Sequence, residues 1–85
     1  MSALDEKFTQ AIADSKALPE RPDNPTLLKL YGLYKQASTG DCADPEPGAT
    51  DFVAKAKWDA WLQLSGLGAD EAKQQYVDLI ESLKG

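Results

Sequence analysis

The residues best suited to chemistry lie in two short segments, YGLYKQ at residues 31–36 and KAKWDAW at residues 55–61. Tyr31, Tyr34 and Lys35 are spaced i, i+3 and i+4, so a helix would bring them to one face. Lys57 follows in the second segment and would reach the same anion if the two helices run parallel. Flat rings beside ammonium groups suit a ligand that is both planar and anionic, such as a nucleotide.

Two residues outside these segments extend the candidate site. Tyr76 would add a hydroxyl donor, and Lys16 would add another positive charge. A structural interpretation stays open, because tyrosines at helical spacing are typical of a core and lysines beside them commonly extend into water. Trp58 and Trp61 are expected to be packing residues rather than stacking platforms.

Several kinds of catalytic site are excluded by composition. The chain has no histidine, which removes His-assisted nucleophilic catalysis and most zinc sites. The carboxylate pairs, such as Asp70 with Glu71, fit helix ends or solvated loop charge. Cys42 is the only cysteine, so no internal disulfide forms and a reducing compartment is expected. We expect no enzyme, no metal and no cofactor.

The 85 residues predict a single domain, 1–85, of which 42% are hydrophobic and 27% charged. A formal net charge of -5 argues against nucleic acid as a partner. No apolar run approaches the roughly 20 residues of a membrane span. The N-terminal residues are acidic and lack the apolar stretch of a signal peptide. These observations predict a cytoplasmic protein.

Apolar residues recur at helical spacing in four segments. The first helix is expected at residues 3–15, with Ser2 and Asp5 as a capping pair. The second is expected to begin with Asn24 as N-cap and Pro25 as its first residue, and to end at Gly40. The third and fourth are expected at residues 51–64 and 69–84, and no alternating pattern indicates a strand.

The connection at residues 41–49 is long and rich in proline, with Pro45 and Pro47. At ~3.3 Å per residue it can reach about 30 Å, the length of a helix of about 20 residues. It can therefore return along the bundle and start the third helix parallel to the second, which a short turn cannot do.

YKQA at residues 34–37, GD at 40–41 and KAKWDAW at 55–61 together resemble the acyl-CoA-binding protein family. The resemblance covers residues 8–83. It implies an all-α four-helix bundle, up-down-down-up, with a long overhand connection between helices 2 and 3. It also implies a monomeric, non-enzymatic carrier of medium- to long-chain fatty acyl-CoA. Acyl-CoA-using enzymes or membrane surfaces would be transient partners.

The resemblance also implies roles for individual residues. Tyr31 would pack on the adenine, and Lys35 and Lys57 would bind phosphates. Leu28 would form a wall of the acyl groove. The other implied ligand-binding residues are Lys16, Gly32, Leu33, Tyr34 and Tyr76.

Three features depart from the family pattern. Val53 stands where many members have a lysine near the ligand, so that ionic contact would be missing. Ser15 replaces an apolar residue between the first and fourth helices, and the chain stops at Gly85 without a longer basic tail. The alternative function is a helical protein-interaction module without a small ligand.

Overall fold

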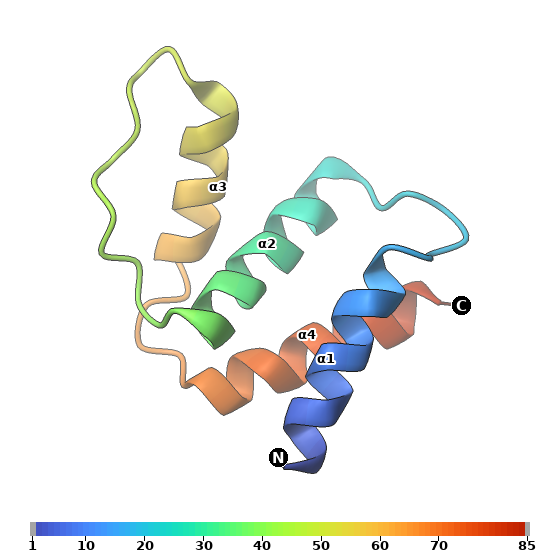
Figure 1. Cartoon of the computed structure of the whole chain (residues 1–85). Helices are drawn as coiled ribbons and strands as arrows, with labels where there is room; N and C mark the ends of the chain where they lie inside the picture. The colour runs from blue at the N-terminus through green and yellow to red at the C-terminus, as the bar shows by residue number, and fades with distance from the viewer. Residues whose placement is uncertain (1, 85) are drawn as a thin grey trace.

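The computed structural model describes residues 2–84 and consists of four helices. They are α1 (Ala3–Ser15), α2 (Asn24–Ser38), α3 (Phe52–Leu62) and α4 (Ala69–Leu83). The connection between α2 and α3 arches outside the helices and returns the chain so that α2 and α3 run in the same direction (Figure 1). The predicted all-α, up-down-down-up bundle is confirmed. No helix within residues 2–84 combines the length and apolar character that a membrane crossing requires.

The N-terminal helix ends follow the predicted capping chemistry, with one correction. Ser2 accepts a hydrogen bond from the Asp5 amide at 3.1 Å, as expected. The N-cap of α2 is Asp23, whose carboxylate accepts from the Thr26 amide, so the assignment of Asn24 was wrong. Both residue types cap well and proline is tolerated throughout the first turn, so the pattern does not separate the two positions.

The predicted C-terminal end is correct for α2 but not for α3. Gly40 has φ 97° and closes α2 as expected, because only glycine adopts this conformation without strain. The third helix ends at Leu62 rather than residue 64, and the chain then turns through Gly66, where φ is 89°.

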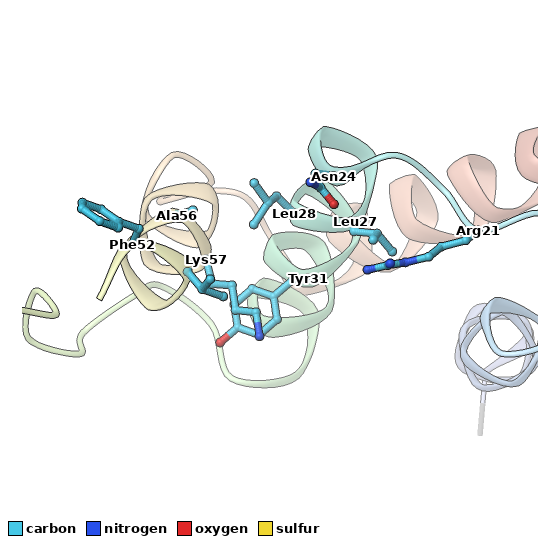
Figure 2. A pocket seen from close by; sticks show the side chains of 9 residues that line it. Arg21, Asn24, Leu27, Leu28, Tyr31, Phe52, Ala56 and Lys57 are labelled. Carbon is cyan, nitrogen blue, oxygen red and sulfur yellow. The ribbon is translucent and has the colours of Figure 1, made fainter. Parts of the chain in front are cut away.

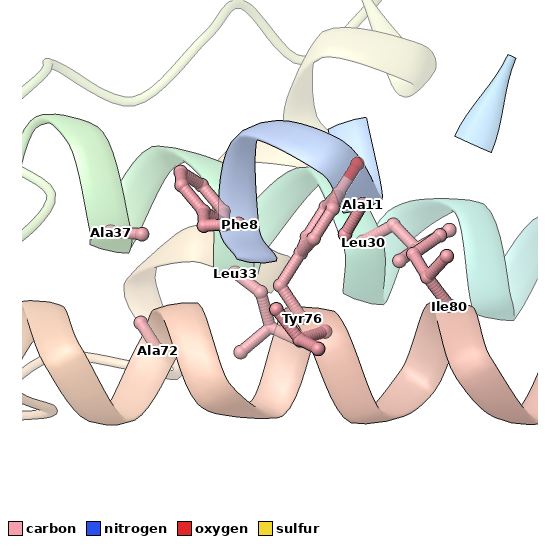
Figure 3. Packing of buried hydrophobic residues seen from close by; sticks show 9 residues of the cluster. Phe8, Ala11, Leu30, Leu33, Ala37, Ala72, Tyr76 and Ile80 are labelled. Atoms are coloured by element: carbon pink, nitrogen blue, oxygen red, sulfur yellow. The ribbon is translucent and has the colours of Figure 1, made fainter. Parts of the chain in front are cut away.

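The hydrophobic core lies between α1, α2 and α4 (Figure 3). Phe8 and Ala11 of α1 meet Tyr76 and Ile80 of α4 there, and the Phe8 and Tyr76 rings pack edge to face with centroids 5.2 Å apart. Leu33 belongs to this core and has no exposed surface. Its side chain packs on α1 and α4, and its predicted place in the ligand-binding segment stays a prediction.

The third helix lies outside that core and packs against α2 alone among the helices. Trp61 is its only buried residue. Much of the apolar surface of this helix is uncovered, since Phe52 is 78% and Val53 68% exposed. The indole of Trp61 donates to the Gly40 carbonyl and that of Trp58 to the Asp44 carbonyl. The tryptophans thus tie the α2–α3 connection to α3.

A buried amide joins the end of α2 to the turn before α4. Gln36 is 1% exposed, and its Nε2 donates to Asp41 Oδ1 at 2.7 Å and to the Leu67 carbonyl at 2.8 Å. The Gly66 amide donates to the same Asp41 oxygen. The hydrogen bonds from Gly66 and then from Gln36 lower the pKa of Asp41. This network fixes where α3 ends relative to α2.

Candidate functional site

The site begins where the backbones of α2 and α3 touch. A Cβ placed on Gly32 would lie 2.8 Å from the carbonyl oxygen of Ala60. Toward their N-termini the helices leave a cleft of about 480 Å³, which we call the main cleft (Figure 2). Its lining residues are Arg21, Asn24, Leu27, Leu28, Tyr31, Phe52, Val53, Ala56 and Lys57.

The wall of the main cleft is chiefly apolar. Leu28 of α2 faces Ala56 of α3 across it, whereas Leu27 lies beside Arg21 (Figure 2). Leu28, which the resemblance implies as a wall of the acyl groove, is one of these lining residues. An apolar cleft with few polar groups is the usual form of a site for a small organic ligand.

Tyr31 and Lys57 meet at one end of this cleft. Lys57 Nζ lies 5.5 Å from the centroid of the Tyr31 ring, and Figure 2 shows the two side chains side by side. Tyr31 also lines two smaller hollows. One, the loop hollow, lies against the α2–α3 connection and also contains Lys57 and Trp61. The ring therefore stands where three depressions of the surface join.

Lys35 lies one turn after Tyr31 in α2 and does not itself line any of the three depressions. Its Nζ lies 4.9 Å from the Trp61 ring centroid. Within residues 2–84 neither Lys35 nor Lys57 forms an ion pair, whereas Lys55, Lys73 and Lys84 all do. The two ammonium groups predicted to act together are thus held near aromatic faces without a carboxylate partner.

The third depression, which we call the tyrosine hollow, lies between the end of α1 and α2. It has a volume of about 270 Å³ and is lined in part by Tyr31, Tyr34 and Tyr76. Tyr34 is 41% exposed, whereas Tyr76 is 5% exposed. Ser15 also lines this hollow, and its hydroxyl donates to the Ile12 carbonyl. The hydroxyl that Ser15 introduces in place of an apolar side chain therefore has its hydrogen-bond partner within α1.

Other predicted site residues lie elsewhere. Lys16 is exposed at the C-cap of α1 and lines none of these three depressions. Gly32 is buried against α3, and Leu33 lies in the core. These two residues set the position of Tyr31 and Tyr34 rather than presenting side chains to the cleft.

The sequence analysis did not identify five of the lining residues, namely Arg21, Asn24, Leu27, Phe52 and Ala56. The one sequence feature that could have drawn attention to Arg21 is that it is the only arginine of the chain. Across the part of the chain described here, no cluster of three or more metal-ligating side chains occurs.

The pattern that defines the family described as "Acyl CoA binding protein" matches residues 5–80. The chain belongs to the acyl-CoA-binding protein family. It is 46% identical over 76 residues to acyl-CoA-binding protein homolog 1 of Caenorhabditis elegans, covering 89% of this chain and 88% of the relative.

Larger proteins also contain this family's sequence. The chain is 49% identical over 83 residues to enoyl-CoA delta isomerase 2 of Rattus norvegicus, covering 98% of this chain but 21% of the isomerase. Among solved structures, acyl-CoA-binding protein 2 of Oryza sativa superposes with a TM-score of 0.91 at 36% identity. That superposition covers 95% of this chain and 90% of the rice chain.

Proposed function

We propose that this member of the acyl-CoA-binding protein family is a carrier of medium- to long-chain fatty acyl-CoA. The observation that carries the proposal is the Lys57–Tyr31 pair at the end of an apolar cleft. A cation and a ring suit the nucleotide end of the ligand, and the cleft suits its hydrocarbon end. Family membership supports the same ligand class.

The head group is assigned to the polar end of the site. Tyr31 packs on the adenine, while Lys35 and Lys57 bind phosphates. Coenzyme A carries roughly four negative charges at neutral pH, counting up to two on its 3′-phosphate. Tyr34 and Tyr76 add contacts around the head group, and Lys16 adds a further positive charge from the end of α1.

The acyl chain is assigned to the main cleft, beside Leu28. Burial of hydrocarbon is worth about 0.8 kcal/mol per methylene. A chain of ~14 methylenes would contribute roughly 11 kcal/mol before the costs of binding are subtracted. The hydrocarbon, more than the phosphates, would then distinguish acyl-CoA from free coenzyme A.

The proposed role is binding without chemistry, by a cytoplasmic monomer. A carrier releases the thioester it received, so incubation with palmitoyl-CoA should leave the ester intact. Chromatography of the mixture over hours would measure this, and release of free coenzyme A above the protein-free rate would contradict the non-enzymatic role.

The central experiment is titration calorimetry with palmitoyl-CoA, free coenzyme A and palmitate. We expect the ester to bind at one site and far more tightly than either fragment. Equal affinity for palmitoyl-CoA and coenzyme A would reject the acyl groove. Absence of binding to all three would favour the protein-interaction module, for which exposed Phe52 and Val53 would then be the first surface to test.

A further inference from the structure

We propose that Arg21 is a further phosphate-binding residue, which reaches the coenzyme A moiety from the α1–α2 connection. This inference rests on the proposed function and adds a cation that neither lysine-bearing motif contains. The ligand group it would recognise is a phosphate, either the diphosphate or the 3′-phosphate.

The position of Arg21 opposite the two site lysines is the first argument. Lys35 and Lys57 approach from the α2–α3 side, whereas Arg21 lines the main cleft from the segment before α2. Figure 2 shows its side chain extended beside Leu27, with the guanidinium directed toward Tyr31. An anion near Tyr31 would thus have cations on both sides.

The second argument is that its charge is uncompensated. Arg21 is exposed, and within residues 2–84 it forms no ion pair and no side-chain hydrogen bond to a carboxylate. Guanidinium groups bind phosphate oxygens through two parallel N–H donors, which adds orientation to the charge. A guanidinium lying unpaired at an apolar cleft is therefore suited to a phosphate carried by a hydrophobic ligand.

The third argument comes from Val53, which lines the same cleft from α3. Val53 is exposed and uncharged, so a lysine substituted there would place an ammonium group on the wall of the cleft opposite Arg21. Arg21 contributes its guanidinium on the other wall. The two positions should consequently act as alternatives for one ionic contact.

The test is a double-mutant cycle measured by calorimetry with palmitoyl-CoA at low ionic strength. Arg21→Ala should weaken binding about 10- to 150-fold, the effect of losing a charge-assisted hydrogen bond. Val53→Lys should recover most of that loss in the Arg21→Ala background and change the parent protein by less. Lys29→Ala is the matched control, because it removes one exposed positive charge outside the main cleft.

The outcomes separate this inference from the proposed function. If the parent binds palmitoyl-CoA and Arg21→Ala binds it no more weakly than Lys29→Ala does, the inference is wrong and the carrier function stands. If the parent fails to bind, the function itself is wrong. Repeating the titrations with 3′-dephospho-palmitoyl-CoA identifies the phosphate: a loss that persists assigns the diphosphate, and a loss that disappears assigns the 3′-phosphate.

Discussion

Tyr31 is held in place by the residues on either side of it in α2. Leu30 and Leu33 are buried in the core, and Gly32 lets α3 approach. The ring therefore lies at the border between core and cleft and loses little freedom when a ligand arrives. An aromatic ring ordered in advance binds a base at lower entropic cost than a mobile one.

The role of this ring is tested by comparing Tyr31→Ala with Tyr31→Phe. Stacking of a base on an aromatic ring is worth about 1–3 kcal/mol. We expect Tyr31→Ala to lose that affinity for palmitoyl-CoA and Tyr31→Phe to keep most of it, because the π-face remains. Calorimetry measures both, and equal affinity of the alanine variant and the parent would remove Tyr31 from the site.

A side chain at Gly32 would collide with the backbone of α3, so this position tolerates substitution poorly. Gly32→Ala would gain about 1 kcal/mol in helix propensity, but its Cβ would meet the Ala60 carbonyl oxygen at 2.8 Å. Overpacking of this kind costs about 1–3 kcal/mol. We expect lower stability in urea unfolding and weaker palmitoyl-CoA binding. Gly48→Ala, with open space around it, is the control and should leave both properties unchanged.

At the scale of the element, α3 depends on few contacts. Trp61 is its one buried side chain, and its indole hydrogen bond to the Gly40 carbonyl spans the connection. Elements with few buried contacts tend to open before the rest of a protein does. Since the proposed acyl groove lies between α2 and α3, docking of α3 and ligand binding should be linked.

That link is tested with Trp61→Phe and Trp58→Phe. Loss of a hydrogen bond that leaves a partly buried carbonyl unpaired costs about 1–3 kcal/mol, so Trp61→Phe should destabilise the protein by about that amount. Trp58→Phe should cost less, because its bond to the Asp44 carbonyl is exposed. Hydrogen exchange of α3 amides should accelerate in Trp61→Phe and slow again with saturating palmitoyl-CoA. Exchange rates of α3 amides that do not change with palmitoyl-CoA would show that docking of α3 is not coupled to ligand binding.

The sequence predicted the helices and their connections well, because local residue types determine where a helix begins and ends. The capping residues, the prolines and the length of the connection were sufficient for four helices and for the parallel α2–α3 pair. It predicted poorly which face of a helix packs into the core and which faces the cleft. Leu33 and Leu28 are both apolar residues of α2, yet Leu33 faces the core and Leu28 the cleft. Arg21 lies outside any helical pattern, so only the folded chain brings it to Leu27.

At the scale of the whole molecule, charge is divided between a negative surface and a locally positive site. The formal net charge is -5, so an anionic ligand is repelled at long range and attracted near Lys35 and Lys57. The screening length is about 10 Å at 0.1 M salt and about 3 Å at 1 M. We expect palmitoyl-CoA affinity to fall as salt rises, while palmitate binding changes less. A salt-independent affinity for palmitoyl-CoA would contradict the phosphate contacts.

Two ion pairs that join α1 to α4 contribute to the pH dependence of the fold's stability. Lys73 binds Asp5 at 2.6 Å and Lys84 binds Asp14 at 2.7 Å. Hydrogen bonds from these lysines lower the pKa of each carboxyl below its ordinary 3.8. The carboxylates in turn raise the pKa of both lysines above 10.5.

The sign of each shift gives the expected pH profile. A lowered carboxyl pKa contributes stability that is present above pH 3.8 and is lost as pH falls through the folded-state value. A raised lysine pKa contributes stability that is present below pH 10.5 and is lost as pH rises through the folded-state value. Urea unfolding should therefore give a plateau that declines at both ends. The double variant Asp5→Asn with Asp14→Asn should flatten both declines, because Lys73 loses its carboxylate partner and Lys84 keeps only Glu81. A double variant that follows the parent profile at both extremes would show that these pairs do not control the stability of the α1–α4 interface.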